Sequence, residues 1–196
     1  EELVTSRHES GSYYTPRHVV SFMCKLAIRG YLEAKCSLPE KLVNNFLENQ
    51  DVSSLSDTQV HNILLALDDL KVVDPACGSG SYLLGLLQEL VVCYRILYSK
   101  KVIHNPRSLY ELKLRIITNN LYGVDIDSFA VNVAMLRLWL SLAVEAEIPV
   151  ALPNLDFKIE VGDSLTGDLG TEKQLRLNFD IDESTKKVSD LKAQFM

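Results

Sequence analysis

The stretch VVDPACGSGSYLLGLL, from Val72 to Leu87, constrains the fold of this 196-residue chain more than any other segment. It begins with a short apolar run, turns through Gly78 and Gly80, and continues as an apolar run with helical spacing. A strand, a glycine-rich turn and a helix in this order form the first half of a βαβ unit, which builds parallel sheets. Backbone N–H groups at the start of such a helix bind small ligands. The stretch therefore predicts an α/β fold with a ligand site at this turn.

Hydrophobic periodicity places the other elements around this unit. Apolar residues at helical spacing predict helices from Val19, after Pro39 and after Ser56, and again over 81–98, 109–120 and 127–145. Short apolar runs predict strands over 71–74, 121–126 and 157–161. We therefore predict a Rossmann-like α/β fold with about three parallel strands, helices on both faces of the sheet and an N-terminal helical lead-in.

The predicted elements fall into three regions. Residues 1–70 form the N-terminal helical region, 71–165 form the α/β core, and 166–196 form a polar tail with helical character. Ser56 and Gln59 fit a capping box at one helix start, and Asp127 fits an N-cap at another.

The helix that follows Asp127 is apolar on most of its sides, which predicts that it is buried. We expect Trp139 to belong to the core with Leu136, Leu140 and Ala143, rather than to form a platform for stacking a base.

Composition excludes several classes of protein. The net charge of −6 gives no overall basic footprint for nucleic acid. The first residues do not form a signal peptide, and polar residues interrupt the long apolar stretches, so we expect a cytoplasmic protein without a membrane span. We also expect reduced thiols and no metal site. Cysteines and histidines are scattered without a Cys-x-x-Cys pair or metal-ligand spacing: Cys24, Cys36, Cys77, Cys93, His8, His18, His61 and His104.

Two familiar ligand classes do not fit the glycine-rich turn. A phosphate-binding P-loop ends in Gly-Lys-Ser/Thr, but Gly80 is followed by Ser81 and Tyr82. A dinucleotide site needs a third glycine and an acidic residue about 20 positions on. Leu83 stands at that third position, and Asp125, the next acidic residue at a strand end, lies 45 positions after Gly80.

The turn instead resembles the first motif of the DNA methyltransferases that methylate the N6 amine of adenine. The matching segment is DPACGSGSYL, and the resemblance implies S-adenosylmethionine as cofactor on a class I methyltransferase sheet. Asp74 would lie near the ammonium of the cofactor, an opposite-charge pairing. Gly78 and Gly80, with Ala76 beside them, would let the backbone approach the methionine part. Cys77 has no histidine nearby in sequence and is expected to be a packing residue rather than a nucleophile.

Three further segments match the same family in order. YYTP at 13–16 resembles its N-terminal cofactor motif, which implies that Tyr14 and Thr15 contact the cofactor. LYGVDID at 121–127 resembles its second motif, which implies that Asp125 accepts hydrogen bonds from the ribose and that Ile126 packs on the adenine. VGDSL at 161–165 resembles its third motif. This assigns to the site Asp163, which would accept from the exocyclic amine of the cofactor, and Ser164.

The catalytic motif of this family is absent from the 196 residues. It consists of Asn or Asp, two prolines and an aromatic residue, which hold the target amine and stack on a flipped base. No two of the six prolines here are adjacent, so no catalytic residue is assigned. In the family this motif follows the fourth strand, so we expect it, and the parts that contact double-stranded DNA, to lie beyond Met196.

The resemblance implies the cofactor-binding portion of a DNA adenine-N6 methyltransferase, with a long gap between motifs that resembles fused type II restriction–modification enzymes. Two alternatives stay open: a methyltransferase of the same fold that acts on RNA or on a protein glutamine, and a non-catalytic binding or assembly module. The fragment alone is expected to be inactive. Because the first strand lacks its family neighbour, we expect self-association at its open edge, or cover from the tail after Gly170.

Overall fold

The computed structural model describes residues 15–100, 107–146 and 152–166. Residues Glu1–Ser164 form one compact unit and Leu165–Met196 a second, and the predicted helical tail lies outside the described residues. The elements, all in the first unit, are α2 Arg17–Cys36, α3 Glu40–Asn49, α4 Asp57–Asp69, β1 Val72–Asp74, α5 Ser81–Tyr98, α6 Leu109–Asn119, β2 Leu121–Asp125, α7 Ser128–Ala143 and β3 Ile159–Val161.

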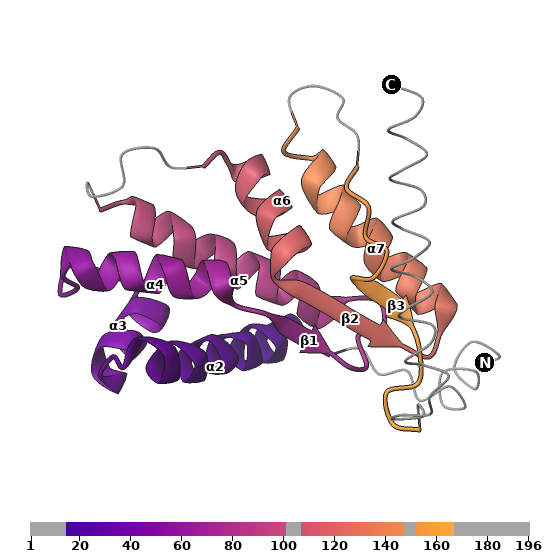
Figure 1. Ribbon diagram of the computed structural model, residues 1–196, viewed down its shortest axis with the longest axis horizontal. Helices are drawn as coiled ribbons and strands as arrows, with labels where there is room; N and C mark the ends of the chain where they lie inside the picture. Colours follow the sequence, from indigo (N-terminus) through magenta and orange to yellow (C-terminus); the bar gives the residue numbers. More distant parts are fainter. Residues whose placement is uncertain (1–14, 101–106, 147–151, 167–196) are drawn as a thin grey trace, which may run out of the picture. The chain divides into compact units, whose positions relative to one another are not determined.

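The three strands form one parallel sheet in the order β1-β2-β3, which confirms the predicted α/β class (Figure 1). Val73 pairs with Tyr122, and Val124 pairs with Glu160. Because all strands run the same way, their carboxyl ends meet at one edge of the sheet. The loops after β1, β2 and β3, which carry three of the four predicted motifs, therefore gather at this edge.

One face of the sheet carries the core. Leu121 and Ile159 are buried on this face. Helices α5, α6 and α7 each contact β2. Packing is close at Gly123, where an added Cβ would lie 2.9 Å from Leu83 Cδ1. A glycine in this strand therefore lets the start of α5 approach the sheet.

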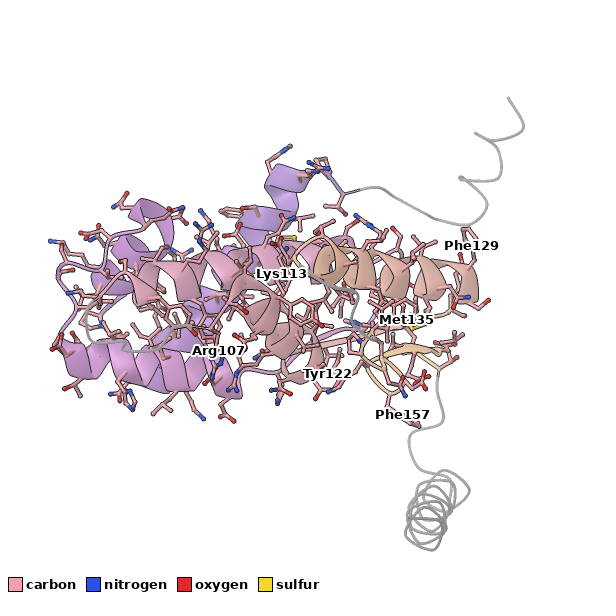
Figure 2. The ribbon with its side chains drawn as sticks, turned by 90° about the horizontal axis from the view of Figure 1, so that it is seen from above. Arg107, Lys113, Tyr122, Phe129, Met135 and Phe157 are labelled. Carbon is pink, nitrogen blue, oxygen red and sulfur yellow. The ribbon has the colours of Figure 1, made fainter. Side chains whose placement is uncertain are left out.

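The opposite face is open in the part of the chain that the structure describes. Val73 is 60% exposed, Glu160 is exposed, and Tyr122 is half-buried beneath Lys158, whose Nζ donates to its hydroxyl at 2.8 Å. Figure 2 shows Tyr122 on the side of the sheet away from α7. Helices were predicted on both faces, and the described helices pack on one; the strand alternation that exposes Val73 leaves apolar surface for a further layer.

The N-terminal helices pack on α5 through small residues and one polar cluster. An added Cβ at Gly85 would lie 2.3 Å from Val20 Cγ1, so α2 and α5 approach closely at this point. Asp68 of α4 accepts from the Tyr94 hydroxyl at 2.6 Å and from Arg115 Nε at 2.9 Å, which joins α4, α5 and α6. This packing holds the start of α2 against the helix that follows the glycine-rich turn.

The predicted capping signals are confirmed. Ser56 and Gln59 exchange side-chain and backbone hydrogen bonds in a capping box at the start of α4, and the Asp127 side chain accepts from Phe129 N at the start of α7. Ser108 and Glu111 form a second capping box at the start of α6.

Two sequence-based expectations need correction. Strand β3 begins at Ile159 rather than at 157, because Phe157 adopts φ +64° in a turn that closes with Lys158 N donating to Leu155 O. Helix α7 is buried on one side only: Leu136 and Leu140 are 51% and 53% exposed. Trp139 does pack against the core, and its Nε1 donates to Pro153 O at 3.0 Å.

Helix α5 is long and apolar enough to cross a membrane by length and composition, a test that core helices of soluble proteins also pass. Most of its leucines are buried in this unit, including Leu83, Leu87, Leu90 and Leu97.

Candidate functional site

The glycine-rich turn is held by its own backbone and by the neighbouring strand. Cys77 N donates to Val124 O at 2.9 Å, which ties the turn to β2. Gly80 N donates to Cys77 O at 2.8 Å and closes the turn just before α5 begins at Ser81. Burial raises the pKa of the Cys77 thiol to about 12, with Asp74 and Asp125 contributing in the same direction. A thiol held neutral in this way fits the predicted packing role.

Asp125, at the end of β2, lies directly against this turn. Its Oδ2 accepts from Gly78 N at 2.7 Å, and its Oδ1 accepts from Asp127 N at 2.9 Å. Each carboxylate oxygen has a second lone pair, so both can accept one more hydrogen bond. The structure thus brings together the first two predicted motifs, which are 47 residues apart in sequence.

The loop after β3 reaches the same place. Gly162 N donates to Asp125 O at 2.9 Å, and the Ser164 hydroxyl donates to Pro75 O at 2.7 Å. Asp163 lies between these two anchored residues and is exposed. The third motif is therefore attached to both of the other loops.

The two glycines of the turn serve different purposes. Both have positive φ, +51° at Gly78 and +81° at Gly80, a conformation that favours glycine. An added Cβ at Gly78 would meet no atom of the described residues within 4 Å, whereas one at Gly80 would lie 3.0 Å from the Cβ of Ala134 on α7. Both glycines were expected to open space for a ligand; at Gly80 the missing side chain instead lets α7 pack on the turn.

Asp74, at the end of β1, also has unused hydrogen-bonding capacity. Its Oδ1 accepts from Ala76 N at 3.1 Å, while its Oδ2 is buried without a partner among the described residues. Burial raises the pKa of Asp74, the Ala76 hydrogen bond opposes this shift, and nearby Asp125 adds to it. A buried acceptor beside a second carboxylate is the environment that a cationic group would stabilise.

The remaining predicted site residues have different outcomes. Ile126 is 73% exposed at the end of β2, where an apolar side chain could pack on a planar group. Thr15 is half-buried just before α2. Tyr14 lies outside the described residues.

Arg137 was missed by the reasoning from sequence. It lies on α7, and its Nη1 donates to Ser79 O at 2.7 Å and to Ser79 Oγ at 3.3 Å. Arg137 lies three residues after Ala134, on the same side of the helix as the contact with Gly80. This spacing could have revealed it only once the packing of Ala134 was known.

The residues present fit a nucleoside cofactor with a cationic amino-acid end. Asp74 offers a buried oxygen for a cation, Gly78 leaves open space, and Asp125 offers free lone pairs for hydroxyl donors. A parallel sheet with this turn and these carboxylates at one edge defines a Rossmann-like domain of the methyltransferase class.

The chain belongs to the family described as the MmeI DNA-methyltransferase domain, whose sequence model matches residues 48–151. This match spans the turn, β2 and α7, and it confirms the family resemblance inferred from the motifs.

Three curated proteins are similar to the chain. One is named as a type II restriction enzyme and methyltransferase of Methanocaldococcus jannaschii and is 33% identical over 189 residues, 86% of this chain and 16% of that protein. DNA methyltransferase A of Bacillus subtilis is 31% identical over 108 residues, 52% of this chain and 11% of that protein. Adenine-specific methyltransferase PglX of Streptomyces coelicolor is 35% identical over 71 residues, 36% of this chain and 5% of that protein.

Proposed function

We propose that this chain is the S-adenosylmethionine-binding part of a DNA methyltransferase that modifies the N6 amine of adenine in a restriction–modification system. The observation that carries the proposal is the contact between Asp125 Oδ2 and Gly78 N at 2.7 Å, beside the buried and unpartnered Oδ2 of Asp74. When bound, the cofactor would supply a methyl group on a sulfonium centre.

In this proposal each part of the site has one task. Asp74 pairs with the ammonium of the cofactor, and the open space at Gly78 admits its methionine part. Asp125 accepts from the ribose hydroxyls, and Ile126 covers one face of the adenine. Asp163 and Ser164 border the adenine edge, and Tyr14 and Thr15 border the methionine end.

Calorimetric titration of the 196-residue chain with S-adenosylhomocysteine tests the cofactor assignment. We expect binding by the wild-type protein and at least tenfold weaker binding by Asp125→Ala, because two acceptor positions for the ribose are lost. Asp156→Ala, in an exposed loop before β3, is the matched control and should bind like wild type. A folded wild-type chain that releases no heat would contradict the proposal.

The adenine substrate is supported by the motif resemblance and by the name of one relative, adenine-specific methyltransferase PglX. We propose that double-stranded DNA is bound by regions outside these residues, which agrees with the net charge of −6. Mass spectrometry of nucleosides from DNA treated with the protein in its natural full length should detect N6-methyladenine. Methylation of RNA or of a protein glutamine instead would favour the first alternative function, and cofactor binding with no transfer would favour a binding module.

A further inference from the structure

Arg137 of α7 is the one long cationic side chain among the described residues that is bonded to the glycine-rich turn. Its Nη1 donates to the Ser79 carbonyl at 2.7 Å and to the Ser79 hydroxyl at 3.3 Å. Among the described residues, no carboxylate lies within ion-pair distance of Arg137, and its side-chain hydrogen bonds go to Ser79. A hydrogen bond from a charged donor to a carbonyl is among the stronger hydrogen bonds in proteins.

The contact acts on the peptide unit between Ser79 and Gly80, through its carbonyl oxygen. The carbonyl of Cys77 already accepts from Gly80 N, and Gly78 N already donates to Asp125. Ser79 lies between two glycines with positive φ, and glycine has the greatest backbone freedom to lose. Arg137 holds the carbonyl of the peptide between Ser79 and Gly80, while Cys77 O accepts from its N–H, so both ends of this one peptide unit are restrained against rotation.

Helix α7 is suited to this task because it begins at Ser128, three residues after Asp125. Asp127 caps the helix, Ala134 packs on Gly80, and Arg137 reaches Ser79. One helix thus connects the carboxylate at the end of β2 with the adjacent turn residues Ser79 and Gly80. A displacement of α7 would move the turn relative to Asp125.

We propose that Arg137 is a positioning residue, which holds the Ser79 peptide so that the turn between Gly78 and Gly80 stays in the conformation that receives the cofactor. The inference rests on the proposed function for the identity of the ligand, but the constraint on the turn is a property of this chain alone. The proposal predicts that loss of the Arg137 side chain changes the dynamics of the turn but not of the core. Loss of a residue that only stabilises the core would have no such local effect.

Hydrogen exchange of single amides, measured by NMR on the 196-residue chain, tests the constraint directly. In Arg137→Met, which keeps most of the side-chain volume, the Gly78 and Gly80 amides should exchange about tenfold faster, while core amides such as that of Leu90 keep their rates. Arg95→Met, on the exposed side of α5, is the matched control and should change neither set. Unchanged exchange in the turn, or equal acceleration at all amides, would overturn the proposal.

A second readout measures the ligand. Arg137→Met should weaken binding of S-adenosylhomocysteine about tenfold, and Arg137→Lys, which keeps a cationic donor but not the planar fork, should fall between it and wild type. If wild type binds and the methionine variant binds equally well, the inference about Arg137 fails and the proposed function stands. If wild type does not bind, the proposed function fails, and amide exchange still decides the role of Arg137. Should the methionine variant not fold, Arg137→Leu, which also lacks a donor, takes its place, and exchange at Gly80 equal to wild type in that variant would overturn the proposal.

Discussion

At the carboxyl ends of the strands, three residues of the candidate site are in energetically unfavourable states: one has a buried polar atom without a partner, and two have a strained backbone conformation. Asp74 holds a buried oxygen without a partner, and Gly78 and Gly80 hold a backbone conformation that other residues adopt at a cost of about 1–2 kcal/mol each. Strain and unpaired polar groups of this kind cluster at binding sites, where a ligand compensates them. At each of these residues we therefore predict that a substitution changes the stability of the fold and the binding of the ligand to different extents.

Asp74→Asn should make the chain more stable and a weaker binder at neutral pH. Because the folded state raises the pKa of Asp74, stability is lost as pH rises from the unfolded value of 3.8 through the folded value, and it stays lower above it. The asparagine variant does not suffer this loss. Thermal unfolding should therefore show a midpoint above that of wild type at pH 7 and no difference near pH 3, with weaker S-adenosylhomocysteine binding at pH 7. A lower midpoint at pH 7 would contradict this account.

Alanine at the two glycines of the turn should have different effects. Gly80→Ala combines strain at φ +81° with a contact of 3.0 Å to Ala134, and it should destabilise the chain by about 2–4 kcal/mol. Gly78→Ala meets no neighbour and should cost about 1 kcal/mol, yet its new Cβ would occupy the space left for the cofactor. Urea unfolding and ligand titration of both variants measure the two effects. An equal loss of stability would show that the packing on Ala134 is unimportant.

Helices meet at small residues in this fold, and one of these contacts places the start of α2 beside α5. Helix α2 approaches α5 where Gly85 faces Val20, and α7 approaches the turn where Ala134 faces Gly80. An alanine in a helix is ordinarily more stable than a glycine by about 1 kcal/mol, so a glycine in the middle of α5 needs a reason in the packing.

The sign of Gly85→Ala should therefore depend on Val20. In the wild-type chain the new Cβ would lie 2.3 Å from Val20 Cγ1, and we expect a net loss of about 1–2 kcal/mol. In a Val20→Ala background the same change should be neutral or stabilising. Gly30→Ala, in α2 with no neighbour within 4 Å, is the matched control and should stabilise by up to about 1 kcal/mol. A double-mutant cycle by chemical denaturation gives the coupling, and additive effects would refute the close contact.

At the scale of the whole molecule, β1 is an outer strand of the sheet that the described residues form. Strand β1 pairs with β2 alone among the described residues, and Val73 on its open face is 60% exposed. An unpaired strand edge beside apolar surface is a template for pairing with another chain.

We therefore predict that the 196-residue chain self-associates at concentrations of about 100 μM, unless its own tail after Gly170 covers the edge. Light scattering should report a mass above that of the monomer, and Val73→Lys should lower it. Val144→Lys places the same charge at the exposed C-cap of α7 and is the control that should leave the mass unchanged. A monodisperse wild-type monomer with a disordered tail would contradict the prediction, and so would dissociation by Val144→Lys alone.

The sequence by itself determined the elements, the order of the motifs and the family. Turn glycines, capping residues and apolar periodicity act over a few neighbours, so the α5 start at Ser81 and the Asp127 cap could be predicted without coordinates. The tertiary structure decided what each residue of the site contacts. That Gly80 faces Ala134, that Arg137 reaches Ser79 and that Leu136 stays exposed depend on how α7 lies against the sheet. Packing between elements distant in sequence sets that arrangement, and local periodicity carries no information about which side of an apolar helix finds a partner.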